Sequence, residues 1–233
     1  MKQLALEFLQ VTQLAALAAA HWIGRGRKHE ADEAATTAMR QALNQMAIDA
    51  RVVIGEGEMD EAPMLYIGER LGTGAGRLLD IAVDPLEGTS LVAGGQGNSI
   101  AVITAAPRGS LLHAPDMYMK KIAVGPDAAG AIDIEEPMET NLKRVAAKLG
   151  KSVSELKVMV QQRERHQELI AEIQEAGARV LLFSEGDVTG AVATAIAGTD
   201  IDMFVGIGGA PEGVISAVAI RCLGGDMQAQ LLP

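Results

Sequence analysis

Hydrophobic and polar positions repeat with different periods in the two halves of the chain. In the first half, apolar residues recur every three to four positions from Leu4 to Trp22, which predicts a helix over residues 3–23 with one apolar face. A second helix is predicted at about 31–46, and strands are predicted at 51–54, 79–83, 99–105 and 121–124. We expect the strand at 79–83 to stop at Asp84-Pro85, because proline cannot donate to a strand ladder. This half is typical of an α+β domain.

From about residue 141 the pattern changes to strands that alternate with helices. Strands are predicted at 157–160, 179–183 and 203–207, and they precede helices at about 165–176, 188–197 and 211–223. This alternation is typical of βαβ units and a parallel sheet. We therefore predict an α+β / α/β chain with two domains, residues 1–140 and 141–233, although no long linker separates them.

Composition narrows the class of protein. The 233 residues carry 20 Lys and Arg against 30 Asp and Glu, so the net charge of −10 argues against nucleic acid as a partner. Hydrophobic residues make up 48%, which excludes a disordered acidic tail. The one cysteine, Cys222, allows no internal disulfide and is expected to pack in its apolar stretch. No apolar run approaches the roughly 18 residues of a membrane span. We expect a cytoplasmic protein that binds neither membrane nor nucleic acid.

The segment most informative about chemistry is Asp84-Pro85-Leu86-Glu87-Gly88-Thr89-Ser90, which follows a hydrophobic strand. Two carboxylates on a tight turn can converge on a hard divalent cation, which prefers oxygen ligands. Gly88 permits close approach of the backbone, and Thr89 adds a hydroxyl where a helical turn could begin. An ordinary acidic turn is the alternative, but this order of residues at a strand end is specific.

This segment resembles the metal signature of the lithium-sensitive sugar and inositol phosphatase superfamily. Further stretches resemble one branch, class II fructose-1,6-bisphosphatase, over essentially the whole chain and in order; they are Val53-Ile54-Gly55-Glu56-Gly57-Glu58, Ala62-Pro63-Met64-Leu65-Tyr66-Ile67-Gly68, Ala114-Pro115-Asp116-Met117-Tyr118-Met119 and Gly206-Ile207-Gly208-Gly209-Ala210-Pro211-Glu212-Gly213-Val214. The resemblance implies a layered αβαβα sugar-phosphatase fold.

The resemblance also implies a set of carboxylate ligands for Mg²⁺ or Mn²⁺, namely Asp32, Glu56, Asp84, Glu87 and Glu212. Taken alone, Asp32 is better explained as an acid that complements a helix N-terminus, and only the family pattern favours a metal role for Glu212 over the same explanation. Glu58 competes with Glu56 for the same role, and spacing does not separate them. Five converging carboxylates would repel one another without a cation, and a divalent ion would offset that repulsion.

The mechanism that the resemblance implies is attack of water on phosphorus. Thr89 would polarise that water, and Asp32 would accept a hydrogen bond from Thr89. Arg165 could hold the remote phosphate with its guanidinium fork. The residues that the resemblance places against substrate are Glu87, Gly88, Thr89, Tyr118, Arg163, Glu164, Arg165, Glu185, Gly186, Asp187 and Gly209.

The chain departs from the family pattern in four places. Arg27-Lys28-His29-Glu30 is more basic than the usual Asp-Lys-Asn with a small residue, Glu164 replaces a proline, and Glu185 replaces an aspartate. The chain also ends at Pro233, whereas the family continues. We therefore expect a second domain that is incomplete at its C-terminus, with the last strand, 228–232, at an exposed edge.

The predicted activity is metal-dependent hydrolysis of the 1-phosphate of fructose 1,6-bisphosphate, a gluconeogenic step of carbohydrate metabolism, by a homo-oligomer. Alternatives are sedoheptulose-1,7-bisphosphatase, a dual activity, or a truncated non-catalytic relative that binds metal or assembles with a partner. A nucleotide site at Gly72-Thr73-Gly74-Ala75-Gly76 lacks the strand–turn–helix context of a dinucleotide fingerprint. A Ser/His/Asp hydrolase is poorly supported, since the four histidines lie in no nucleophile context.

Overall fold

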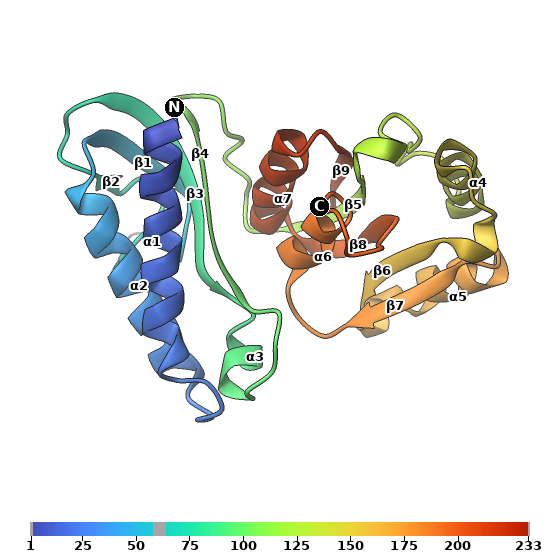
Figure 1. The fold of residues 1–233 in the computed structure, drawn as a ribbon, viewed down its shortest axis with the longest axis horizontal. Helices are drawn as coiled ribbons and strands as arrows, with labels where there is room; N and C mark the ends of the chain where they lie inside the picture. The colour runs from blue at the N-terminus through green and yellow to red at the C-terminus, as the bar shows by residue number, and fades with distance from the viewer. Residues whose placement is uncertain (1, 58–63, 233) are drawn as a thin grey trace. The chain divides into compact units, whose positions relative to one another are not determined.

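The chain forms two compact units, residues 1–114 and 115–233, each with its own β-sheet (Figure 1). The structure, a computed structural model, describes residues 2–57 and 64–232. The boundary predicted near residue 140 lies inside the second unit. The reason is β5 (Tyr118–Val124), which pairs along its whole length with two later strands of that unit.

The first unit begins with two helices, α1 (Lys2–Ala20) and α2 (Lys28–Gln45), which lie side by side and cover one face of the sheet (Figure 1). The predicted apolar face of α1 is confirmed, because Val11, Ala15 and Ala19 are buried against Met39 and Leu43 of α2 in one core. Both helices were predicted, with ends displaced by up to three residues. The amides of Gly24 and Gly26 in the turn between them donate to the carbonyls of Val92 and Ala93.

The sheet of the first unit has the order β2-β1-β3-β4, with β1 and β3 parallel and the other pairs antiparallel. Its strands are β1 (Ile48–Ile54), β2 (Arg70–Leu71), β3 (Arg77–Glu87) and β4 (Ile100–Pro107). The prediction that β3 stops at Asp84-Pro85 is wrong. The register with β4 shifts between Asp84 and Glu87, and this irregularity lets the strand continue past Pro85 without its missing donor. A short helix, α3 (Thr89–Ala93), then begins at Thr89, which confirms the predicted helical turn.

The sheet of the second unit has the order β7-β6-β8-β5-β9. Its further strands are β6 (Lys157–Gln161), β7 (Arg179–Phe183), β8 (Met203–Gly209) and β9 (Asp226–Leu232). The predicted βαβ arrangement is confirmed for β6, which lies parallel to both β7 and β8. Strand β9 pairs antiparallel with β5 and is the last strand in the order, so its predicted place at an edge of the sheet is also confirmed.

Helices cover both faces of this second sheet. One core joins α4 (Met138–Leu149) and α5 (Gln167–Glu175) to the strands, and a smaller one joins α6 (Asp187–Ala193) and α7 (Ala210–Cys222). Three 3₁₀ turns, η1 (Pro126–Ala128), η2 (Val153–Glu155) and η3 (Glu164–His166), complete the unit. Helix α4 was not predicted.

The mixed α/β content of the two units confirms the predicted fold class. The expectation that Cys222 is packed is wrong: it is exposed at the end of α7, because the helix turns Ile220 toward the core and carries Cys222 about 200° further round. No helix in the described part of the chain is long and apolar enough to cross a membrane.

Candidate active site

Two of the predicted acids, Asp32 and Glu56, lie near each other beyond the C-terminal end of β1, and a third, Asp84, lies near the C-terminal end of the adjacent strand β3. The two strands are parallel, and Ile54 of β1 is in register with Ala82 of β3. Glu56 follows the end of β1 by two residues, and Asp84 lies two residues beyond Ala82 within β3. Asp32 lies in the second turn of α2, near enough to Glu56 for the two carboxylates to repel each other. Ligands of open α/β sheets bind at this kind of strand end.

The pKa values of Asp32 and Glu56 are both raised, as expected for neighbouring carboxylates whose charges no cation balances. Burial, together with the charge of Asp32, raises the pKa of Glu56 to about 7. Burial also raises the pKa of Asp32, and the neighbouring His29 offsets part of that rise. Loss of solvation and like charge both disfavour ionisation, so a cation at this position would stabilise the ionised pair. Glu58, the competitor of Glu56, lies outside the described residues.

The segment Glu87–Thr89 turns the chain from β3 into α3 at the same end of the sheet. Glu87 is buried, and its carbonyl accepts a hydrogen bond of 2.6 Å from the Ser99 hydroxyl. Gly88 has φ +80°, and a Cβ there would overlap the side chain of Leu91, so the turn requires glycine. Thr89 follows as the first residue of α3 and is half-buried. The hydrogen bonds that the backbone amides of Gly24 and Gly26 donate to α3 connect that helix to the turn before α2, the helix that contains Asp32.

The fifth predicted ligand, Glu212, belongs to the second unit. It lies in the first turn of α7, and its carboxylate folds back over Gly209, where a Cβ would collide with it. Its Oε2 atom is buried and has no hydrogen-bond partner among the described residues. Across residues 2–57 and 64–232, no three Asp, Glu, His or Cys side chains lie close enough together to hold a metal ion.

A second group of predicted residues meets at the end of β8. Asp187, the first residue of α6, accepts a hydrogen bond from the ammonium of Lys121, whose side chain is completely buried. A Cβ at Gly208 would strike both groups of this ion pair. Tyr118 is in register with Gly209 across β5 and β8, so it begins its strand beside the Glu212 turn.

Arg165 is held over Tyr118 by an unusually complete set of contacts. Its guanidinium lies 5.0 Å from the centre of the Tyr118 ring, and its Nε donates to the carbonyl of Ile207 at 2.9 Å. The next residue, His166, is buried; its Nε2 accepts a bond of 2.8 Å from the amide of Ile207, and its Nδ1 bonds the carbonyl of Gln161 at 2.7 Å. Both polar atoms of the Ile207 backbone are therefore used to fix this turn.

The remaining predicted substrate residues differ in how closely they approach this group. Gly186 has φ +102° and leads into Asp187, and Glu185 before it is half-buried. Arg163 and Glu164 are exposed, and the Arg163 guanidinium bonds only weakly, at 3.4 Å, to the carbonyl of Gln162. The structure thus joins Tyr118, Arg165, Asp187, Gly209 and Glu212 in one region but leaves Arg163 and Glu164 facing solvent.

Comparison with known proteins identifies the family. A sequence model described as bacterial fructose-1,6-bisphosphatase, glpX-encoded, matches residues 2–233. The chain belongs to this family. The resemblance inferred from the motifs is therefore confirmed.

The relatives include enzymes named for one sugar and for two. The class 2 fructose-1,6-bisphosphatase of Haemophilus influenzae is 54% identical over 232 residues, which are 100% of this chain and 70% of that protein. Fructose-1,6-bisphosphatase 1 class 2 of Escherichia coli K12 is 54% identical over 231 residues, 99% of this chain and 69% of the relative. The D-fructose 1,6-bisphosphatase class 2/sedoheptulose 1,7-bisphosphatase of Crocosphaera subtropica is 50% identical over 241 residues, 98% of this chain and 70% of the relative.

Sequence reasoning missed an ion pair that holds the Glu56 loop of this family member. Glu69 is buried and accepts bonds from Arg40 of α2 at 2.6 Å and from the amide of Leu65 at 2.5 Å. Leu65 has φ +53°, a left-handed conformation rare for leucine, and its carbonyl accepts the amide of Glu56. The contacts therefore run from α2 through Glu69 and Leu65 to Glu56. Only the proximity of acids and bases in space could have revealed them.

Proposed function

We propose that this chain hydrolyses the 1-phosphate of fructose 1,6-bisphosphate, releasing fructose 6-phosphate and inorganic phosphate. The observation that carries the proposal is the half-buried acid pair Asp32 and Glu56, with a pKa of about 7 for Glu56, at the strand ends that also hold the Glu87-Gly88-Thr89 turn. Repelling carboxylates beside a hydroxyl are suited to phosphoryl transfer assisted by a cation.

The donor atoms fit Mg²⁺ or Mn²⁺. Asp32, Glu56, Asp84, Glu87 and Glu212 offer carboxylate oxygens, the ligands that hard divalent cations prefer. The raised pKa values in the first unit and the unpartnered Oε2 of Glu212 indicate carboxylates whose charge is not compensated by protein groups. A bound divalent ion would neutralise these acids and draw negative charge away from the phosphate.

The chain's own residues would orient the nucleophile. The Thr89 hydroxyl is placed at the start of α3, whose carbonyls are bonded to the turn that precedes Asp32. We propose that Thr89 accepts a hydrogen bond from the attacking water and donates its own proton in a hydrogen bond to Asp32. Asp32 then fixes the direction of the hydroxyl, and in-line attack on phosphorus follows without a covalent intermediate.

The second unit has groups of its own that suit a sugar phosphate. Arg165 presents a guanidinium fixed by Ile207 and Tyr118, which suits the phosphate that is not hydrolysed. Glu185 and Asp187 would accept hydrogen bonds from sugar hydroxyls, and the buried Lys121 would keep Asp187 in place. Arg165 is also exposed but is fixed by Ile207 and Tyr118, whereas the Arg163 guanidinium bonds only the carbonyl of Gln162. We therefore assign Arg163 and Glu164 a smaller part in binding.

Phosphate release by purified protein with Mg²⁺ or Mn²⁺ tests the proposal. Thr89→Ala should lower kcat by about 10² to 10⁴ while the calorimetric affinity for Mn²⁺ changes little, because only the hydroxyl is lost. Thr89→Ser is the matched control and should retain most of the turnover. Equal turnover of Thr89→Ala and wild type would overturn the role of Thr89.

A substrate panel separates the remaining alternatives. The cyanobacterial relatives named for both fructose and sedoheptulose bisphosphates favour testing the two sugars side by side. Turnover that Glu212→Ala abolishes would exclude a non-catalytic relative, whereas folded protein that binds Mn²⁺ but turns over neither sugar would establish one. We also propose that the protein acts as a homo-oligomer; the exposed leucines of α1 support this. Its cytoplasmic location stays a prediction.

A further inference from the structure

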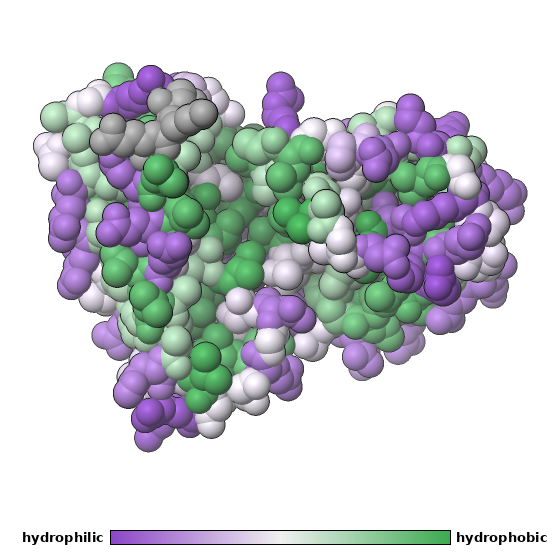
Figure 2. All heavy atoms as spheres, in the orientation of Figure 1, coloured by the Kyte–Doolittle hydropathy of each residue, from purple (hydrophilic) through white to green (hydrophobic). Residues whose placement is uncertain are grey.

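His166 is a polar residue enclosed within the second unit. Figure 2 shows many hydrophilic residues on the surface of this unit, whereas His166 is only 1% exposed. Histidines in general are less deeply buried than this. The backbone leaves room for the ring at Gly206 in β8, where a Cβ would come within 3.3 Å of the imidazole. A polar ring buried to this extent must be hydrogen-bonded, because burial without partners is costly.

Both nitrogens of the His166 ring have a partner, and the two partners establish which nitrogen carries the proton. The amide of Ile207 can only donate, so the Nε2 atom that it reaches at 2.8 Å is an acceptor without a proton. The carbonyl of Gln161 can only accept, so the Nδ1 atom 2.7 Å away carries the proton. The ring is therefore held in one neutral tautomer between the end of β6 and β8.

Arg165, the residue before it, bonds the same two strand residues. Its Nε donates to the carbonyl of Ile207 at 2.9 Å, and its Nη2 donates to the side-chain Oε1 of Gln161 at 3.3 Å. Strand β6 pairs with β8 only as far as Phe204, so Ile207, three residues on, takes these partners from η3 instead of from a strand. Within the described residues, the two bonds occupy two of the five N–H groups of the guanidinium and leave three for an anion.

We propose that His166 is a positioning residue for the phosphate that is not hydrolysed, and that it acts through Arg165. The inference rests on the proposed function, in which Arg165 holds that phosphate. The Nε2 acceptor holds the backbone of Ile207, whose carbonyl in turn accepts from the Arg165 Nε. A guanidinium binds phosphate through parallel N–H groups that must be aligned together, so an unrestrained Ile207 would lower the affinity for the phosphate.

Substitution can separate the two hydrogen bonds of His166. Asparagine has its side-chain amide near the place of Nδ1, so His166→Asn keeps a donor for Gln161 but is too short to reach the Ile207 amide. Glutamine is one methylene longer, so in His166→Gln its Oε1 can take the place of Nε2 and accept from Ile207. Both variants replace the imidazole with the same amide group, and they differ chiefly in the bond to Ile207.

Calorimetric titration with fructose 6-phosphate, which retains the phosphate assigned to Arg165, tests the proposal without turnover. His166→Asn should weaken the affinity about tenfold, and His166→Gln should stay within about threefold of wild type. Arg165→Ala should weaken it at least as much as His166→Asn does. The double variant that combines these two substitutions should bind no more weakly than Arg165→Ala, because His166 acts only through the arginine. Circular dichroism and thermal unfolding establish that each variant is folded.

Wild-type affinity in His166→Asn, or a further loss when it is added to Arg165→Ala, would overturn the positioning role. Equal weakening in His166→Asn and His166→Gln would overturn the Ile207 bond as its route. If neither variant folds, His166 serves the stability of the fold and the role is likewise overturned. A wild type that binds fructose 6-phosphate but does not hydrolyse the bisphosphate would contradict the proposed function alone, whereas one that does not bind it would contradict both.

Discussion

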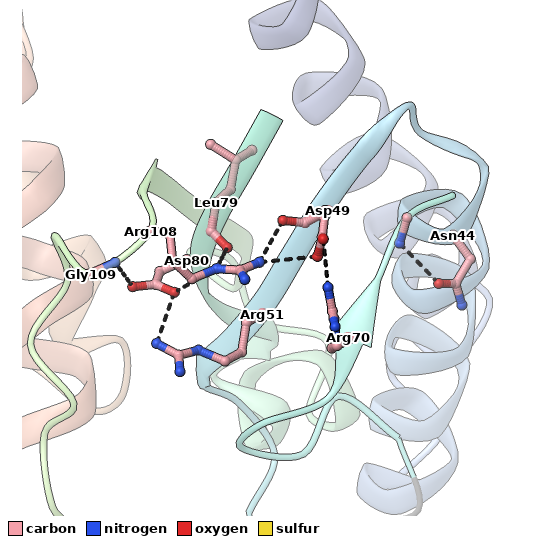
Figure 3. A network of polar contacts seen from close by, with 9 residues as sticks. Asn44, Asp49, Arg51, Arg70, Leu79, Asp80, Arg108 and Gly109 are labelled. Atoms are coloured by element: carbon pink, nitrogen blue, oxygen red, sulfur yellow. Dashed lines mark hydrogen bonds and ion pairs between the residues drawn. The ribbon is translucent and has the colours of Figure 1, made fainter. Parts of the chain in front are cut away.

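The sheet of the first unit carries acidic side chains near both ends of β1 and β3, and the two groups differ in what surrounds them. Asp49 and Asp80, toward the strand starts, lie in a network with three arginines (Figure 3). Asp32 and Glu56, beyond the other end of β1, lie beside each other, and burial outweighs the one favourable charge, His29, that acts on Asp32.

The network in Figure 3 compensates its acids fully. Asp49 accepts from Arg70 at 2.5 Å and from Arg108 at 3.1 Å, and these bonds hold the pKa of Asp49 below its usual value. Asp80 is completely buried and accepts from Arg51 at 3.2 Å and from the amide of Gly109 at 2.6 Å. The pKa of Asp49 is lowered, whereas the pKa values of Asp32 and Glu56 are raised. This difference in direction separates an acid that arginines already compensate from acids suited to binding a cation.

The same change, aspartate to asparagine, should have opposite effects at the two ends. Asp80→Asn leaves the arginines beside it without their buried counter-charge and should lower the free energy of unfolding by about 2–3 kcal/mol. Asp32→Asn removes a repelling charge and, in EDTA, should leave that free energy unchanged or raise it by up to about 1 kcal/mol. Urea unfolding followed by fluorescence of Trp22, the only tryptophan, reports on this unit.

If Asp80→Asn and Asp32→Asn lowered the free energy of unfolding equally, pairing with arginine would not distinguish the acids at the two ends of the sheet. Loss of the Asp32 carboxylate would then be as harmful to the fold as loss of Asp80, and the assignment of Asp32 to ligand binding would lose its physical basis.

The part of the site that is formed by residues close together in the chain could be predicted from the sequence. Asp84, Glu87 and Thr89 lie within one turn, and the turn conformation follows from Gly88. The strand end was missed, because the shift in register at Pro85 depends on the pairing with β4 and not on proline alone.

Features that depend on distant residues could not be predicted in the same way. The burial of Lys121 against Asp187 joins positions in β5 and α6, and the contacts of His166 join the β6 end to β8. Nothing in the local sequence of a lysine or a histidine distinguishes these from exposed ones. Likewise, the outer face of α1 could be recognised as uncovered only once the inner face was seen to be buried.

The pH dependence of stability sharpens the comparison. The pKa of Glu56 rises from 4.5 in the unfolded chain to about 7 in the fold, so the folded protein binds the extra proton. The stabilisation of the fold that comes from protonated Glu56 is fully present below pH 4.5 and is lost as the pH rises through about 7. Glu56→Gln should therefore stabilise the metal-free protein by about 1–2 kcal/mol at pH 8 and have little effect near pH 5.

Urea unfolding of wild type and Glu56→Gln in EDTA at several pH values measures this difference. Glu33→Gln, a change to an exposed acid on α2, is the control and should keep the wild-type pH dependence. A Glu56→Gln protein that still loses stability between about pH 5 and pH 8 would contradict the raised pKa of that carboxyl.

The smallest expected effect comes from the most exposed arginine of the network. The Arg70 side chain is 68% exposed, and Asp49 keeps its bonds to Arg108 when Arg70 is removed. Arg70→Met should cost less than about 1 kcal/mol, and the cost should shrink further in high salt, because an exposed pair is screened by solvent and ions. Comparing urea midpoints at low and high salt measures it. A drop in the free energy of unfolding above about 2 kcal/mol that salt does not change would mean that Asp49 needs Arg70 as a buried counter-charge. The charge of Asp49 would then be balanced by a single pair and not by the shared arginine network.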